Sequence, residues 1–555
     1  MVEAVSEVDG DAFALPVAET GGLEPRRAAL FLLGRALGGG RSAFGGFGQG
    51  AAGGVAERLV GRGAWEGIGH VGNVVRQRCT VIPDSLAGLI RTATSRSRGV
   101  LDGPGSSPRY GRDDNGSEGR HPADMIDHTE ADAVPGQPAR LAALALIHAG
   151  LNQRAGLEEA MWRPPFTTLT PRERAFAMGL AQTTLRRLGS IDRLLDVRLQ
   201  KAPPDAVRAL LRIGVAQALY RDTPAFAAVA STVELAQADP DARAMKGLVN
   251  AVLRRIVEAG APDLPPEADL PDWLWQRWRA AYGEEAALKM AAMAIEEPAT
   301  DLTLRDPADA VALAPELDAE ALAGGSLRTR RRGELGAWPG FAEGRWWVQD
   351  AAAAVPARLL NVEPGETALD LCAAPGGKTL QLAAAGAHVT ALDRSARRLE
   401  RLSANLARTG LTAKVVATPA ERWADPRTFD AVLLDAPCTA TGTFRRHPDV
   451  LWVARPSDIA KLAEVQSRLL DVAARRVRPG GRLVYCVCSL EPEEGEAQIA
   501  AFLTRHPRFR LDPVADGEGG APPGSVTPSG GLRILPFMDG GRDGFYAARA
   551  VAASA

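Results

Sequence analysis

The feature that most constrains the fold is an alternation of short apolar segments with helical patterns after Trp347. Apolar runs of this length, rich in β-branched residues or leucine, are typical of buried strands, and the helical patterns between them indicate parallel pairing. The predicted strands are residues 367–371, 388–392, 414–417, 431–434 and 482–487. We therefore expect residues 346–553 to form a doubly wound, Rossmann-like α/β domain, in which ligands bind at the carboxyl ends of the strands.

Small and acidic residues follow the first two predicted strands. After the first strand comes a loop of small residues that lets the backbone approach a ligand just before a helix begins. The second strand ends at Asp393, where a carboxylate can accept hydrogen bonds from both hydroxyl groups of a ribose; capping of the next helix is the alternative. Dinucleotide and P-loop spacings are absent, so a nucleoside without a pyrophosphate is favoured. The candidate ligand loop is Cys372, Ala373, Ala374, Pro375, Gly376, Gly377 and Lys378.

Thiols follow two other predicted strands. One strand runs into Asp435-Ala436-Pro437-Cys438, and the other ends in Cys486-Val487-Cys488. Strand alternation places Cys486 and Cys488 on the same face, with Cys488 nearer the edge of the sheet. No Cys/His set with zinc spacing accompanies them, so we expect no metal site. The five cysteines are unevenly spread, which favours reduced, reactive thiols over a disulfide framework.

The segment of residues 136–262 has a helical pattern throughout. Thr170-Pro171 indicates a helix N-cap followed by proline, and Ser190 precedes a further apolar repeat. Apolar residues continue at a helical period over residues 206–220 and 225–236. We expect a compact helical bundle, followed over residues 263–345 by linker helices and a small α/β module with a weak strand near Asp301.

The remaining segment, residues 1–135, mixes Gly-rich with Arg/Ser/Asp-rich tracts and is predicted to be disordered. An alternative is that translation starts at Met125. The first 22 residues are acidic, unlike a secretory or transit peptide, and we found no apolar run that could span a bilayer. A cytoplasmic location is therefore expected. The formal net charge of −2 gives no global basic excess that would indicate a nucleic-acid partner.

Several strings in the chain resemble known families. Strings in the last third resemble the Sun (NOL1/NOP2/Sun) family of RNA cytosine-5 methyltransferases; they are residues 369–379, 435–438, 446–449, 487–489 with Glu493-Glu494, and 543–546. Strings in the helical segment resemble the NusB-type RNA-binding domain; they are residues 210–214, 224–234 and 246–255. The likeness covers residues 138 to 553, and this domain arrangement is similar to that of bacterial family members that act on 16S rRNA.

The resemblance implies methylation of cytosine C5 in RNA, with S-adenosylmethionine as cofactor. Cytosine C5 is a poor nucleophile, so a thiolate must first add to C6. The family pattern makes Cys488 this nucleophile, whereas the residues alone do not rank the two thiols. Cys438 would then assist proton removal and product release. Asp435 would hydrogen-bond the base or the cofactor.

RNA contacts are expected in two places. Beside the site they are Arg445, Arg446 and His447, and in the helical segment they are Lys246, Arg254 and Arg255. A solvated charged face is the alternative for the helical cations.

The chain departs from the family pattern at three positions. Val487 replaces the usual Thr, Cys486 stands where Ala is common, and Thr418-Pro419 replaces an expected adenine-side Asp. Transfer RNA as substrate, or RNA binding without catalysis, are the rival functions. The sequence does not give the oligomeric state or the target nucleotide.

Overall fold

The computed structural model describes residues 136–152 and 156–554 of the chain. The predictions of a disordered extension over residues 1–135 and of an alternative start at Met125 lie outside these residues. Within the described ranges, no helix is both long enough and apolar enough to cross a membrane.

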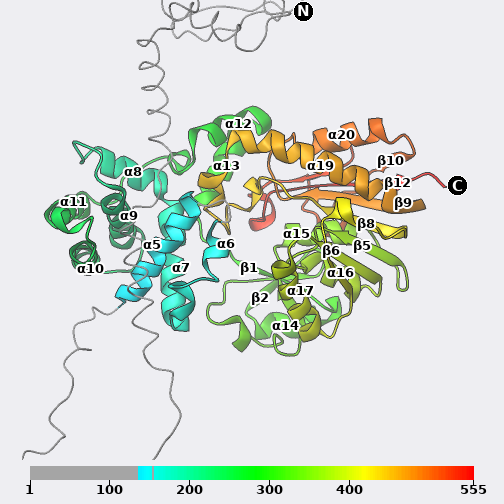
Figure 1. Ribbon diagram of the computed structural model, residues 1–555, viewed down its shortest axis with the longest axis horizontal. Helices are drawn as coiled ribbons and strands as arrows, with labels where there is room; N and C mark the ends of the chain where they lie inside the picture. The colour runs from blue at the N-terminus through cyan, green and yellow to red at the C-terminus, as the bar shows by residue number, and fades with distance from the viewer. Residues whose placement is uncertain (1–135, 153–155, 555) are drawn as a thin grey trace, which may run out of the picture. The chain divides into compact units, whose positions relative to one another are not determined.

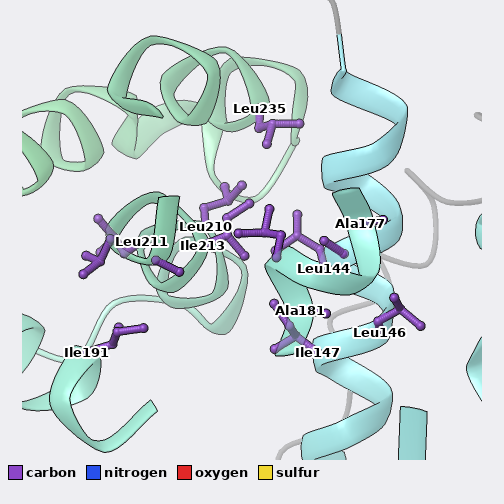
Figure 2. Close-up of a cluster of buried hydrophobic side chains, with 14 of the residues drawn as sticks. Leu144, Leu146, Ile147, Ala177, Ala181, Ile191, Leu210, Leu211, Ile213 and Leu235 are labelled. Atoms are coloured by element: carbon purple, nitrogen blue, oxygen red, sulfur yellow. The ribbon is translucent and has the colours of Figure 1, made fainter. Parts of the chain in front are cut away.

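The first described part of the chain is a helical domain (Figure 1). Its apolar side chains form one buried cluster, in which Leu144 of α5, Ala181 of α7 and Leu210 of α9 meet, as Figure 2 shows. The predicted bundle is confirmed. Its helices are α5 (Gln137–Asn152), α6 (Gly156–Ala160), α7 (Pro171–Arg186), α8 (Leu188–Asp196), α9 (Asp205–Tyr220), α10 (Ala225–Ala238) and α11 (Lys246–Ala259).

Two helix starts in this domain were predicted from capping residues. Thr170 caps α7 as expected, in a capping box with Glu173 and with Pro171 at the first helical position. The prediction that a helix starts after Ser190 is wrong, because α8 already begins at Leu188. The Ser190 amide and hydroxyl donate to the buried carboxylate of Asp269 at 2.7 and 2.9 Å. A distant side chain therefore caps this helix, and Ser190 lies inside it.

A small α/β module follows the helical domain. Helices α12 (Asp272–Tyr282) and α13 (Glu284–Ile295) lead into a four-stranded antiparallel sheet with the order β2-β3-β1-β4. The expected weak strand is β1 (Thr300–Leu304), and the Arg328 side chain of β3 pairs with Asp301 at 2.7 Å in the interior. The other elements are α14 (Ala310–Glu316), β2 (Ala319–Leu322), β3 (Ser326–Thr329) and β4 (Trp346–Val348).

The last part of the chain forms an eight-stranded mixed sheet with the order β10-β12-β9-β8-β5-β6-β7, and β11 pairs with β12. The strands from β9 to β7 in this order are parallel and confirm the predicted Rossmann-like fold. Strand β12 pairs antiparallel with β9, and β10 and β11 pair antiparallel with β12; these three strands were not predicted. The strands are β5 (Thr367–Leu371), β6 (His388–Asp393), β7 (Lys414–Ala417), β8 (Phe429–Asp435), β9 (Val477–Val487), β10 (Phe509–Asp512), β11 (Leu532–Ile534) and β12 (Phe545–Ala552).

Helices cover both faces of this sheet (Figure 1). Alternate strand residues face opposite ways: Leu434 packs in the cluster that includes α19 (Pro456–Arg476) and α20 (Glu496–Arg505). Leu433 packs in the cluster that includes α15 (Ala351–Leu359) and α16 (Gly377–Ala384), and α17 (Ala396–Thr409) packs on β6 and β7. Because helices bury both faces of the sheet, the carboxyl ends of the parallel strands remain as the exposed edge at which a ligand can bind.

Candidate active site

The sheet brings the predicted site residues to one edge. Because β9, β8, β5 and β6 are parallel neighbours, their carboxyl ends lie side by side. Asp393 and Asp435 are the last residues of β6 and β8, and Cys488 directly follows β9. The loop that starts at Cys372 directly follows β5.

Two thiols face each other at this edge. The Sγ atoms of Cys438 and Cys488 are 3.5 Å apart, although 50 residues separate them in the chain. Backbone hydrogen bonds of 3.0 Å join the two loops, from the Ala436 amide to the Cys486 carbonyl and from the Gly442 amide to the Cys488 carbonyl. The two cysteines are thus held as a pair by the sheet and its extensions.

Asp435 lies between an amine and a third thiol. The Lys378 ammonium donates to one carboxylate oxygen at 2.7 Å, and the Cys486 thiol donates to the other at 3.5 Å. Burial lowers the pKa of Lys378, but the charge of Asp435 and its hydrogen bond outweigh burial and raise that pKa above its usual value. Burial, with the Asp435 charge, raises the pKa of Cys486 well above its usual value. Cys486 is therefore a neutral donor, not a second nucleophile.

The loop after β5 owes its shape to two residues with left-handed backbone. Cys372 has a φ of +63° and Gly376 has a φ of +111° at the N-cap of α16. A Cβ atom at Gly376 would collide with the Leu402 side chain of α17, so only glycine fits there. The tight turn leaves the first backbone amides of α16 at the edge of the sheet where the parallel strands end.

Asp393 is buried and tied to this loop. Its carboxylate accepts from the Ala374 amide at 3.2 Å and from the Ser395 amide at 2.8 Å. Ser395 in turn caps α17 by accepting from the Arg398 amide. Both interpretations of Asp393 therefore have support, because it lies beside the loop and also orders the start of the next helix.

The basic string after Cys438 is largely paired within the protein. Arg445 is 4% exposed and lies 4.0 Å from Asp350, while Arg446 forms a bidentate pair with Asp543. Burial, followed by the charge of Arg446, lowers the pKa of His447 to about 4, so this ring is neutral at pH 7. This internal pairing favours a role in holding the loop, and RNA contact by these residues stays a prediction.

The predicted cations of the helical domain lie on α11. Lys246, Arg254 and Arg255 are exposed, and no ion pair holds any of them within the described ranges. Arg254 and Asn250 border an open groove between α10 and α11, which Phe226 also lines. These cations are free to meet a ligand, in contrast to Arg445 and Arg446.

Sequence reasoning missed several residues of the site. The carboxylate of Glu494 accepts from residues that follow both cysteines, and Asp543 holds Arg446. Asp370 is fully buried, and among the described residues only the Thr379 hydroxyl donates to it, at 2.6 Å. Glu494, Asp543 and Asp370 all lie in strings quoted for the family resemblance, which was the available signal. In the part of the chain that the structure describes, no His/Cys/Asp/Glu cluster could hold a metal.

Comparisons with known proteins agree with this architecture. The model of the 16S rRNA methyltransferase RsmB/F family matches residues 357–551, and the NusB family model matches residues 137–258. The crystal structure of PH0851 superposes with a TM-score of 0.62 at 25% identity, covering 75% of this chain and 99% of that one.

Two named relatives align with most of the chain. Ribosomal RNA small subunit methyltransferase B of Xanthomonas campestris is 37% identical over 402 residues, which are 69% of this chain and 91% of the relative. The Thermus thermophilus protein of that name is 37% identical over 428 residues, covering 75% and 97%. Fold and site thus define an RNA methyltransferase with a NusB-type domain and a Rossmann-like domain. The chain belongs to the ribosomal RNA small subunit methyltransferase B family.

Proposed function

We propose that the chain transfers a methyl group from S-adenosylmethionine to C5 of a cytosine in 16S rRNA, through a covalent bond between Cys488 and C6. The observation that carries the proposal is the pair of thiols 3.5 Å apart beside a nucleoside-type loop. The relatives are named ribosomal RNA small subunit methyltransferase B, which favours 16S rRNA over transfer RNA as the substrate.

The residues of the loop fit S-adenosylmethionine. Asp370 has a buried carboxylate oxygen without a partner within the described ranges, and Asp393 and Asp435 are close enough to raise its pKa. Lys378 pairs with Asp435 and the Arg398 guanidinium lies 3.7 Å from Asp393, so two cations face three carboxylates and a positively charged ligand would be favoured beside Asp370. When bound, S-adenosylmethionine supplies a methyl group on a cationic sulfur. Asp393 would accept from the ribose hydroxyls, and the loop of residues 372–378 would surround the ligand.

The surroundings of Cys438 favour Cys488 as the nucleophile. Cys438 hydrogen-bonds Cys488 and is close to the Glu494 carboxylate, and together with burial these contacts raise the pKa of Cys438 well above its usual value. Cys438 therefore keeps its proton and can donate it toward the Cys488 sulfur.

The proposed steps follow from this arrangement. The Cys488 thiolate adds to C6, and the electrons of the C5–C6 bond move onto the ring, so that C5 can accept the methyl group. A base then takes the C5 proton, the C5–C6 double bond re-forms, and the S–C6 bond breaks to return the thiolate. Cys438 serves as this base: once the adduct has formed, it gives its own proton to solvent, its thiolate takes the C5 proton, and it ends the reaction as a thiol again; its high pKa makes its thiolate a strong base.

Other residues position the base and the RNA. A cytosine N4 amino group can donate to Asp435, and Lys378 can stabilise negative charge on the ring. We propose residues 346–553 as the catalytic domain, residues 263–345 as a linker module and residues 136–262 as the RNA-binding domain, with Lys246, Arg254 and Arg255 facing phosphate groups. The target base would be unstacked to reach the thiols.

The mechanism needs both thiols reduced, which fits a cytoplasmic location, because an oxidising compartment would favour a bond between neighbours at 3.5 Å.

The function is tested by incubating the purified protein with labelled S-adenosylmethionine and small ribosomal subunits, free 16S rRNA or tRNA from cells that lack the enzyme. We expect 5-methylcytosine in 16S rRNA. Labelling of tRNA alone, or of neither RNA, would contradict the proposal and favour one of the two rival functions.

A further inference from the structure

A single buried carboxylate joins the two loops that carry the thiols. Glu494 accepts from the Thr439 amide at 3.0 Å and from the Thr439 hydroxyl, and it accepts from the Ser489 hydroxyl at 2.6 Å. Thr439 is the residue after Cys438, and Ser489 is the residue after Cys488. The two hydroxyls also contact each other at 3.0 Å. The residue that follows each cysteine in the chain thus hydrogen-bonds the same carboxylate.

This network is sealed from solvent and independently anchored. Glu494 and Ser489 are fully buried, and Thr439 is 9% exposed. Gln466 of α19 donates to Glu494 at 2.9 Å and to the Pro437 carbonyl at 3.0 Å. Buried hydrogen bonds to a charged acceptor are short and strong, and each donor would cost free energy if left without its partner. The Glu494 carboxylate therefore connects α19 to the two cysteine loops through buried hydrogen bonds.

We propose that Glu494 is a positioning residue that sets the separation of the Cys438 and Cys488 thiols. This inference rests on the proposed function, in which both thiols must reach one cytosine ring. Glu494 itself contacts neither thiol by a hydrogen bond, and it lies away from the ligand loop in the described contacts. Its effect should therefore appear in the chemical step, with little effect on binding.

The first test is Glu494→Gln. The amide keeps the size of the side chain but presents an N–H group where donors already converge. We expect kcat to fall about 100-fold, as displacement of reacting groups by about 1 Å can produce, with the KM for RNA and the Kd for S-adenosylmethionine close to those of the wild type. Glu464→Gln, an exposed carboxylate on α19, is the matched control and should keep wild-type kcat.

A second measurement reports thiol separation without any activity. Diamide, a diazene that is reduced as two thiols are oxidised, would join Cys438 to Cys488, and the rate is followed by mass spectrometry. Removing the negative charge beside Cys438 favours its thiolate and by itself speeds this reaction. We nevertheless expect Glu494→Gln to form the disulfide several-fold more slowly, because the loops separate.

A variant that removes only one hydroxyl distinguishes the proposed effect from misfolding. Ser489→Ala should lower kcat less than Glu494→Gln, and the double variant should fall short of the summed effects, since both act through one network. Wild-type kcat and an unchanged or faster disulfide rate in Glu494→Gln would overturn the proposal. So would a parallel loss of kcat, cofactor affinity and thermal stability. If the wild type itself methylates no RNA, the proposed function fails, but the disulfide rates still test whether Glu494 sets the separation of the two thiols.

Discussion

Asp370 carries a buried carboxyl group near the end of β5, and the Thr379 hydroxyl is its single donor in the part of the chain that the structure describes. Burial raises the pKa of Asp370 to about 7, with a further contribution from Asp435. Because the pKa is higher in the folded chain than in the unfolded one, the stability contributed by the protonated form is complete below about pH 4 and is lost as the pH rises to 7.

The raised pKa of Asp370 predicts that Asp370→Asn stabilises the fold by an amount that depends on pH. The amide oxygen can still accept from Thr379, while the cost of a buried anion disappears. We expect the free energy of unfolding without ligand to increase by on the order of a few kcal/mol at pH 8 and by about a third of that amount at pH 5, because the unfolded carboxyl is already ionised at pH 5 while the folded one is still protonated. Urea unfolding at both pH values measures this. An equal effect at pH 5 and pH 8 would contradict the assigned pKa.

Single residues at strand ends could be predicted from the sequence, but their partners could not. Strand alternation and strand ends give Asp435, Cys438 and Cys488, because that pattern is local. The contact of Glu494 with Thr439 spans 55 residues, and that of Asp543 with Arg446 spans 97. No local periodicity encodes such pairs. For the same reason the pairing of Arg445 with Asp350 and of Arg446 with Asp543 could not be predicted, and RNA contact by these two arginines stays a prediction.

At the scale of elements, the turn between β5 and α16 depends on a glycine. Gly376→Ala would strain a residue at φ +111° and push into Leu402 of α17. We expect a loss of stability of about 1–3 kcal/mol and weaker binding of S-adenosylmethionine, measured by thermal unfolding and calorimetry.

Gly410→Ala is the control for this substitution. Gly410 also has a positive φ, of +66°, but a Cβ atom there would meet nothing within 4 Å. It should lose about 1 kcal/mol from backbone strain alone and bind the cofactor normally. Equal cofactor binding by both variants would show that the turn does not shape the ligand loop.

The parallel strands and most helices of the sheet domain could be predicted from apolar periodicity. The antiparallel strands β10 to β12 could not, because short strands that pair late in the chain lack the strand–helix rhythm on which the prediction relied. The start of α8 was misplaced for a related reason: its cap is Asp269, which is 79 residues from Ser190 in the chain.

At the scale of the whole molecule, RNA binding by the helical domain and methyl transfer by the sheet domain should be separable. Replacing Lys246, Arg254 and Arg255 of α11 with alanine should weaken RNA binding and reduce the slope of log K against log salt by about 0.7 per lost phosphate contact on single-stranded RNA. The kcat at saturating RNA should stay near that of the wild type. Fluorescence anisotropy over a salt series measures the slope.

The control for this variant removes the same charge elsewhere. Lys201, Lys289 and Lys461 are exposed on other elements, and their triple alanine variant should bind RNA almost normally. If both triple variants lose the same affinity and slope, binding depends on net charge and the α11 face has no special role.

The central claim is that Cys488 attacks the base and Cys438 releases it, and the most direct measurement is the trapped covalent complex. Wild type, Cys438→Ala and Cys488→Ala are incubated with 16S rRNA and S-adenosylmethionine, and the denatured products are digested and mapped by mass spectrometry. We predict an adduct that accumulates in Cys438→Ala, with the nucleotide on Cys488, and no adduct in Cys488→Ala. An adduct on Cys438, or full methylation by Cys488→Ala, would contradict the account.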